Sequence, residues 1–159
     1  MSLKIALTGH TKGLGQSLFE RLKNFYPQVT GFARSNGFDI KNPLQRKLII
    51  KAVQDHDVFV NLVHNYYHQS DLLFELHRSW QGQNKIIINV SSAVVKNDEW
   101  ALNDYAMMEY KVQKMNLENL SIHLTKMNLL PKIIIYTISE LNIKTDTTNI
   151  LNIINEKFY

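Results

Sequence analysis

Short apolar runs alternate with segments of helical periodicity along this chain of 159 residues. Strands that alternate with helices are joined by right-handed crossovers, so they form a parallel sheet with helices on both of its faces. The alternation therefore predicts an α/β fold, a three-layer α/β/α doubly wound parallel sheet of about six strands, in one domain over residues 1–159. The expected strands are Leu3–Leu7, Val29–Ala33, a very short Gly37–Ile40, Val58–Val63, Ile86–Val90 and Lys132–Ile138.

The segments between these strands carry helical spacing and helix-terminating residues. Leu14–Tyr26 repeats apolar residues at helical intervals and ends before Pro27, and Pro43 suits the first turn of the next helix. In such a Rossmann-like sheet, ligands bind at the carboxyl ends of the strands, where the motifs described below lie. The other expected helices run from Pro43 to about Gln54, from a cap at Ser70 or Asp71 to about Gln81, from about Tyr105 to Lys126, and from a cap at Thr147 or Thr148 to near Phe158.

Composition excludes several classes of protein. The chain has no cysteine, which excludes disulfides and thiolate metal sites, and its longest apolar runs are too short to span a bilayer. The first residues do not form a signal peptide, so we expect a cytoplasmic protein that binds no membrane. The net charge is +4 but the basic residues are scattered, so we expect an anionic small molecule and no nucleic acid as partner.

The stretch TGHTKGLG, Thr8–Gly15, directly follows the first expected strand and opens the first expected helix. Backbone N–H groups of such a loop, together with the N-terminus of the helix, form an anion site. Gly9 permits a tight turn, Gly13 lets the backbone lie against a pyrophosphate, and Gly15 lets the helix pack close to the sheet. The residues of this loop that we expect to bind a cofactor are Gly9, Thr11, Lys12, Gly13, Leu14 and Gly15.

The loop fits the TGxxxGxG pattern of the short-chain dehydrogenase/reductase superfamily, and the chain resembles that family from Leu3 to about Thr145. The resemblance implies hydride transfer between a nicotinamide cofactor and a small carbonyl or alcohol substrate. Because the chain ends soon after the sixth expected strand, it resembles an unusually short member of the family, C-terminally truncated relative to typical ones. The substrate site would then be open, degenerate or completed by a partner subunit.

Basic residues at two places indicate which nicotinamide cofactor the chain prefers. At the end of the second strand, an acidic residue would bind the 2′-hydroxyl of NAD, and a basic one would accommodate the 2′-phosphate of NADP. Arg34 supplies a planar cation there, Ser35 supplies a hydroxyl, and Lys12 adds a second cation from the glycine loop. We therefore expect NADP(H), with NAD(H) the less favoured cofactor.

Further cofactor contacts follow from the resemblance. An Asp at position 39 would accept a hydrogen bond from the adenine amino group while Ile40 packs on the ring, although Asp39 could equally cap the helix that begins near Pro43. Asn61 in VNLVHN matches the first Asn of the family's NNAG, whereas Leu62 and His64 depart from that pattern.

After the last strand, Thr145 would contact the amide or a phosphate of the cofactor. The Pro-Gly that the family usually has before this position is replaced by Glu140 and Leu141.

The sequence Tyr110-Lys111-Val112-Gln113-Lys114 has the form of the family's YxxxK motif. A phenol can protonate the alkoxide left by hydride transfer when a nearby cation lowers its pKa, and a lysine four residues later lies on the same helix face. The resemblance makes Tyr110 the acid/base and gives Lys114 a second role in holding the nicotinamide ribose. Ser92 would orient the substrate oxygen, with Ser91 as the alternative.

Tyr105 is a rival for the catalytic tyrosine because it follows Ser92 by thirteen residues, the family's usual spacing. However, the residue four positions after it is Glu109, whose negative charge would oppose loss of the phenolic proton. Tyr105 and Tyr110 are separated by about 140° around a helix, so they cannot share one face. We favour Tyr110, with residues 93–104 forming an enlarged loop.

The segment His64–His68 has two histidines four residues apart, but it lies in an expected loop with no third ligand, so we expect no metal site. Tyr66 and Tyr67 are better candidates for a wall of the substrate site. In the resembling family, an Asn of the fourth helix anchors a water relay, and the nearest positions here are Gln69 and Ser70.

Two other functions remain open from the sequence alone. A catalytically inactive NADP-binding sensor or regulatory module would keep the cofactor loop but would not need the YxxxK pair. A nucleotide-sugar reductase is suggested by the short connection between the second and third strands. For any of the three functions, the resemblance implies a homodimer formed through the fourth and fifth helices.

Overall fold

Five parallel strands form one sheet in the computed structural model of the chain, which describes residues 3–102, 104–127 and 130–158. The strands are β1 (Lys4–Thr8), β2 (Gln28–Phe32), β3 (Val58–Asn61), β4 (Ile86–Ser92) and β5 (Lys132–Ile138), arranged in the order β2-β1-β3-β4-β5. The chain runs from β1 outward to β2 and then returns to β3 on the other side of β1. The sheet is therefore doubly wound, and its switch point lies between the carboxyl ends of β1 and β3.

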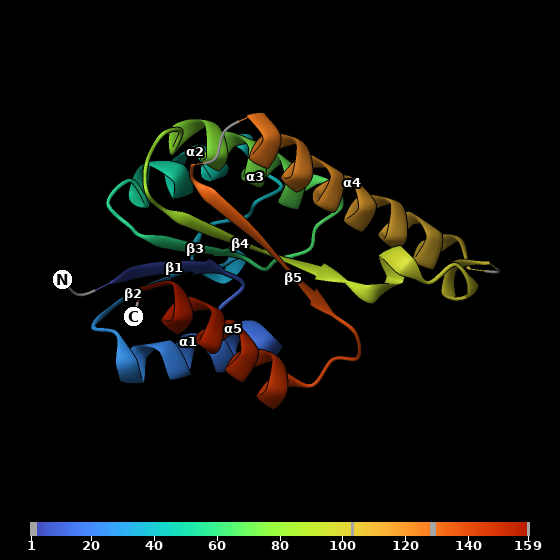
Figure 1. Ribbon diagram of the computed structural model, residues 1–159, viewed down its shortest axis with the longest axis horizontal. Coiled ribbons are helices and arrows are strands. Elements are labelled where there is room, and N and C mark those ends of the chain that lie inside the picture. The colour runs from blue at the N-terminus through green and yellow to red at the C-terminus, as the bar shows by residue number, and fades with distance from the viewer. Residues whose placement is uncertain (1–2, 103, 128–129, 159) are drawn as a thin grey trace.

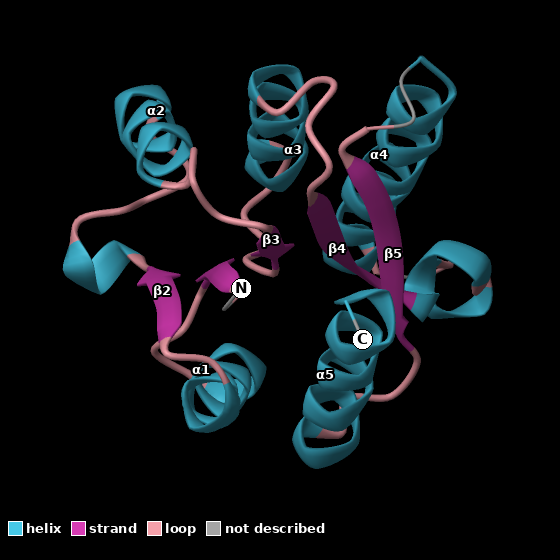
Figure 2. Cartoon of the chain, turned by 60° about the vertical axis from the view of Figure 1, so that its left-hand side comes forward, coloured by secondary structure: helices cyan, strands magenta, loops and turns pink. Residues whose placement is uncertain are grey.

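Helices cover both faces of the sheet and complete the predicted three-layer α/β/α architecture (Figures 1 and 2). One face carries α1 (Gly13–Phe25) and α5 (Ile143–Phe158). The opposite face carries α2 (Pro43–Ala52), α3 (His68–Ser79) and α4 (Tyr105–Met127). Among the described residues, no helix is both long enough and apolar enough to cross a lipid bilayer.

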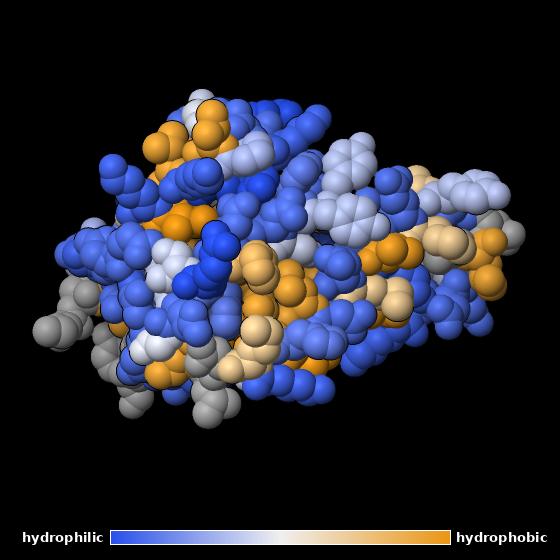
Figure 3. Space-filling model, turned by 90° about the horizontal axis from the view of Figure 1, so that it is seen from above, coloured by the Kyte–Doolittle hydropathy of each residue, from blue (hydrophilic) through white to orange (hydrophobic). Residues whose placement is uncertain are grey.

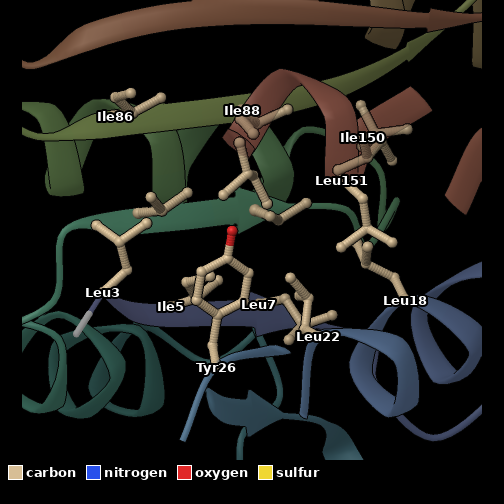
Figure 4. Packing of buried hydrophobic residues seen from close by; sticks show 14 of the residues in the cluster. Leu3, Ile5, Leu7, Leu18, Leu22, Tyr26, Ile86, Ile88, Ile150 and Leu151 are labelled. Carbon is tan, nitrogen blue, oxygen red and sulfur yellow. The ribbon is translucent and has the colours of Figure 1, made fainter. Parts of the chain in front are cut away.

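The core is divided into two layers by the sheet. Between the sheet and helices α1 and α5, leucine and isoleucine side chains of β1 and β4 meet Leu18, Leu22, Ile150 and Leu151 (Figure 4). On the other face, Phe59 of β3 packs edge-on against Trp80, with ring centroids 6.5 Å apart. Because both faces are covered, the strands are apolar nearly throughout, as the sequence predicted.

The prediction of a third strand over Gly37–Ile40 is wrong, because this segment turns back and does not join the sheet. The side chain of Asn36 occupies backbone groups at the carboxyl end of β2, with Oδ1 accepting from Ala33 N at 2.7 Å and Nδ2 donating to Gly31 O at 3.0 Å. Phe38 N then donates to Ala33 O at 3.0 Å, which closes the turn. Apolar residues alone could not reveal this local competition for hydrogen bonds.

Two helix starts also differ from the sequence prediction. Helix α3 begins at His68, so neither Ser70 nor Asp71 caps it, and the Asp71 carboxylate instead pairs with His68 Nδ1 at 2.9 Å. Helix α5 begins at Ile143, ahead of both predicted threonine caps, because Asn142 Oδ1 accepts a hydrogen bond from Thr145 N at 3.0 Å. The enlarged loop over residues 93–104 contains two short 3-10 helices, Ala93–Lys96 and Glu99–Ala101.

Candidate active site

The loop between β1 and α1 is a cradle of backbone without side chains. Gly13 has φ +53°, a left-handed conformation that side-chain-bearing residues rarely adopt. A Cβ on Gly15 would lie 2.0 Å from the carbonyl oxygen of Gly9, so only glycine permits this approach of helix to loop. No side chain of the described residues caps α1, which leaves the first N–H groups of the helix available to an anion. The cradle therefore fits a diphosphate.

A cavity of about 510 Å³, here called the glycine-loop pocket, runs from this cradle past the end of β2. The side chains of Lys12 and Arg34 are exposed, and neither forms an ion pair with any residue that the structure describes. Two unpaired cations at one pocket are suited to a phosphate group. The expected cofactor-binding residues that line this pocket are Gly9, Thr11, Lys12, Arg34, Ser35, Asp39 and Ile40.

Asp39 lies at the edge of the glycine-loop pocket and does not cap a helix. Its Oδ1 accepts from Lys41 N at 2.9 Å, and its backbone N donates to Gln45 Oε1 at 2.6 Å. Helix α2 is capped by Asn42, whose Oδ1 accepts from Leu44 N at 2.9 Å. The capping alternative for Asp39 is therefore wrong, and its second carboxylate oxygen has no hydrogen-bond partner within the described parts of the chain.

A second cavity of about 300 Å³, the Tyr110 pocket, brings together Tyr110, Lys114, Ser91 and Ser92 at the carboxyl end of β4. The Nζ atom of Lys114 lies 5.7 Å from the centroid of the Tyr110 ring, as expected for residues four apart on α4. The side chain of Tyr105 is 94% exposed and lines neither pocket.

Lys114 is buried beneath the Tyr110 pocket. Its Nζ donates to Gln69 Oε1 at 2.8 Å and to the carbonyl oxygen of Val90 at 3.0 Å. Burial lowers the pKa of Lys114 to about 8, although the nearby carboxylate of Glu118 acts in the opposite direction. The ammonium still carries its charge at neutral pH, and one of its three N–H donors has no described protein partner.

The two serines at the end of β4 differ in what their hydroxyl groups contact. Ser91 donates to Glu118 Oε1 at 2.6 Å, so its proton is already engaged. The Oγ of Ser92 accepts a long hydrogen bond of 3.4 Å from Val94 N. The hydroxyl proton of Ser92 therefore remains available to a ligand in the Tyr110 pocket.

His64 lies where the glycine-loop pocket and the Tyr110 pocket meet, and it lines both. Its ring contacts the ring of Tyr110 edge to face, with centroids 4.7 Å apart and an interplanar angle of 86°. Burial and the charge of Lys114 lower the pKa of His64 to about 4, so the imidazole is neutral at pH 7. Sequence reasoning gave this position no role in the site, although His64 was noted as a departure from the NNAG pattern and as one of the two histidines of His64–His68.

Tyr66 lines a third, adjoining cavity of about 280 Å³, together with Glu109 and Gln113. Tyr67 lines none of these three cavities, so of the two tyrosines proposed for the substrate wall only Tyr66 has a suitable position. Within the described parts of the chain, no group of three or more acidic or histidine side chains could hold a metal ion.

Four expected cofactor-binding residues line none of the three cavities, namely Gly13, Gly15, Asn61 and Thr145. The two glycines belong to the backbone cradle, whereas Asn61 and Thr145 lie elsewhere. Asn61 is fully buried, and its Nδ2 donates to Gln69 O at 2.9 Å and to Asn89 Oδ1 at 3.0 Å. Thr145 is exposed in the first turn of α5. The structure therefore gives Asn61 internal hydrogen bonds and leaves Thr145 outside the lining of the three cavities.

No protein-family model and no curated protein sequence matches the chain. Solved structures are nevertheless similar to it. A 3-alpha-hydroxysteroid dehydrogenase from Pseudomonas sp. B-0831, complexed with NADH, superposes with a TM-score of 0.66 at 20% identity over 85% of this chain and 70% of the other. A short chain dehydrogenase from Burkholderia cenocepacia J2315, in complex with NADP, has a TM-score of 0.72 at 15% identity over 89% and 73% of the two chains.

A bulky-bulky ketone specific alcohol dehydrogenase from Comamonas testosteroni is also similar, with a TM-score of 0.73 at 14% identity. The match covers 99% of this chain and 84% of that one. Likeness at these identities establishes the fold, so the chain has the fold of short-chain dehydrogenases/reductases.

Proposed function

We propose that the chain is a short-chain dehydrogenase/reductase that transfers hydride between NADP(H) and a small carbonyl or alcohol substrate. The observation that carries the proposal is that Tyr110, Lys114 and Ser92 share one pocket, which meets the glycine-loop pocket at His64. A cofactor lying across both pockets would bring its reactive ring to these three side chains. That similar folds are found in complex with NADH and with NADP supports a nicotinamide cofactor.

The chain's own residues suit each part of the cofactor. The backbone from Gly13 to Gly15 and the N-terminus of α1 would hold the diphosphate. Lys12 and Arg34 would hold the 2′-phosphate, which NAD lacks. The free N–H of Lys114 would bind a ribose hydroxyl.

The side chains of the Tyr110 pocket suit reversible protonation of a substrate oxygen, and the nicotinamide supplies or accepts the hydride. Ser92 donates its hydroxyl proton to the substrate carbonyl oxygen and fixes its position. Tyr110 transfers its phenolic proton to the same oxygen during reduction and takes a proton back during oxidation. The ammonium of Lys114 stabilises the negative charge that develops on the Tyr110 oxygen.

A titration of the purified chain with NADPH and NADH tests the cofactor preference. We expect NADPH to bind about tenfold more tightly or better, because Lys12 and Arg34, which have no ion-pair partner among the described residues, would pair with the additional phosphate. Replacing Arg34 with Ser should remove most of this preference while leaving NADH binding unchanged. Equal affinity for the two cofactors would contradict the assignment of Lys12 and Arg34.

Replacement of the two candidate tyrosines tests the chemistry. Tyr110→Phe should reduce the rate of NADPH oxidation with carbonyl substrates by about 100-fold or more, because the proton donor is lost. NADPH binding should persist in this variant. Tyr105→Phe should behave as the unmodified chain, since Tyr105 is exposed, and loss of turnover in Tyr105→Phe alone would reverse the assignment.

One observation favours a second candidate, a catalytically inactive NADP-binding sensor or regulatory module. The ring of His64 is packed against Tyr110 where the two pockets meet, which narrows the route of a nicotinamide ring to the Tyr110 pocket. Tight NADPH binding with no turnover on a panel of aldehydes, ketones and nucleotide-linked sugars would support the sensor. We further propose that the protein is a cytoplasmic homodimer, whichever of the two functions it has.

A further inference from the structure

The side chain of Gln69, in the first turn of α3, is buried directly beneath the candidate active site. It is 2% exposed, and every polar atom of its amide has a partner. Its Nε2 donates to the carbonyl oxygens of Asn61 at 2.8 Å and Val90 at 3.1 Å, and its Oε1 accepts from Lys114 Nζ at 2.8 Å. The amide therefore joins the ends of β3 and β4 to α4.

The chemistry of these partners determines the orientation of the amide. Carbonyl oxygens can only accept and an ammonium can only donate, so the NH₂ group must face the strands and the oxygen must face Lys114. Asn61 Nδ2 in turn donates to the backbone oxygen of Gln69 at 2.9 Å and to Asn89 Oδ1 at 3.0 Å. Gln69 cannot turn away without leaving buried polar groups unpaired, which is costly.

We infer that Gln69 is the positioning residue of Lys114, a direct amide anchor that fixes the ammonium below Tyr110 and aims its third N–H into the Tyr110 pocket. The inference rests on the proposed function only for the role of Lys114 in catalysis. Two of the three donors of the ammonium are taken by Gln69 Oε1 and Val90 O. With these two donors held, the third N–H of Lys114 has a fixed direction, toward the Tyr110 pocket.

Titration of Lys114 in the chain without cofactor tests the anchor. The titratable groups near the ammonium are Glu118 and Tyr110 on α4 and His64 on the β3–α3 loop, and changing Gln69 leaves all three in place. Gln69→Met retains the length of the side chain but removes the acceptor. We expect the pKa of Lys114, followed by NMR of ¹³C-labelled lysine, to fall roughly one unit below its value in the unmodified chain.

Gln81→Met is the matched control, because Gln81 is exposed just beyond the other end of α3, and it should leave the pKa unchanged. Lys114→Arg identifies the NMR signal of Lys114. An unchanged pKa of Lys114 in folded Gln69→Met would overturn the inference.

Gln69→Glu should move the pKa in the opposite direction, because a carboxylate beside the ammonium favours its charged form. A residue that only filled space would not give opposite shifts with Met and Glu. If neither variant folds, a nuclear Overhauser contact between the Lys114 ammonium and the Gln69 amide protons in the unmodified chain decides the question. Its absence, when other buried contacts are seen, would also overturn the inference.

These measurements use no cofactor, so they separate the anchor from the proposed function. If the pKa of Lys114 responds to Gln69 but NADPH does not bind, the proposed function fails while the anchor stands. If the chain turns over substrate, the pH profile of kcat should shift with the pKa of Lys114 in Gln69→Met.

Discussion

Protonation of His64 is expected to destabilise the folded chain. Burial and the charge of Lys114 lower its pKa from the ordinary value of 6.5 to about 4 in the folded chain. Between these two pH values the unfolded chain binds a proton at His64 and the folded chain does not. The free energy of unfolding must therefore fall as the pH is lowered from 6.5 to 4.

Replacement of His64 with Gln should reduce this acid sensitivity. Allowing for the partial exposure of the ring, we expect the unmodified chain to lose about 2 kcal/mol more than His64→Gln between pH 7 and pH 4. Urea denaturation of both proteins at several pH values measures the difference. His56 and His77 also have lowered pKa values because of burial, but they are present in both proteins and cancel. Parallel stability curves would contradict a neutral His64 in the folded chain.

Some residues of the candidate site could be predicted from the sequence and others could not. Tyr110 and Lys114 share a face because of helix periodicity, and Lys12 and Arg34 follow strand ends, so local pattern was enough to place them. The contacts of His64 and Gln69 depend on how the segment after β3 folds. That fold is fixed from outside the segment, because Thr8 Oγ1 accepts hydrogen bonds from the backbone N–H groups of positions 62 and 63 at 3.0 and 3.1 Å.

At the scale of elements, a partly buried ion pair joins α2 to α3 beside the glycine-loop pocket. Arg46 is 6% exposed, and its Nη2 lies 3.0 Å from Glu75 Oε1. Its Nη1 donates to the carbonyl oxygen of Ile40 at 2.8 Å, and Ile40 lines the pocket. The pair therefore links helix packing to the shape of the candidate cofactor site.

Removal of one partner of this pair should be costly. Glu75→Ala leaves the buried Arg46 guanidinium with Asp71, at 3.9 Å, as its only carboxylate partner among the described residues, so we expect a loss of roughly 3 kcal/mol in the free energy of unfolding. Urea denaturation measures this loss. Glu20→Ala is the control, because Glu20 is exposed on α1 and should cost less than about 0.5 kcal/mol. Equal effects of the two substitutions would show that the pair does not support the fold.

The elements themselves were largely predictable because burial on both faces makes strands continuously apolar and helices periodic. The failures lie where side chains compete for backbone hydrogen bonds, as Asn36 does at the carboxyl end of β2 and Asn142 does before α5. Such competition depends on which backbone groups come within reach of the side chain in the folded chain. The sequence pattern alone does not show which asparagine will compete in this way.

At the scale of the whole molecule, α4 carries a stripe of apolar side chains on its outer side. Met108, Val112, Met115 and Ile122 are between 39% and 46% exposed, and their spacings of four, three and seven residues place them along one line of the helix. Figure 3 looks onto the face covered by α2, α3 and α4 and shows hydrophobic side chains among the hydrophilic ones. A row of partly exposed apolar side chains on a surface helix is typical of an interface.

Because Tyr110 and Lys114 lie on the same helix as this stripe, pairing of α4 with a second copy would also stiffen the helix that carries the candidate catalytic residues. Met115→Glu places a charge at the middle of the stripe and should convert a dimer into a monomer at micromolar concentration, as measured by sedimentation velocity. Phe25→Glu is the control, because Phe25 is 69% exposed on α1, across the sheet from α4, and its replacement should leave the dimer intact. A monomeric unmodified chain, or a Met115→Glu variant that still dimerises, would show that the stripe does not join two copies.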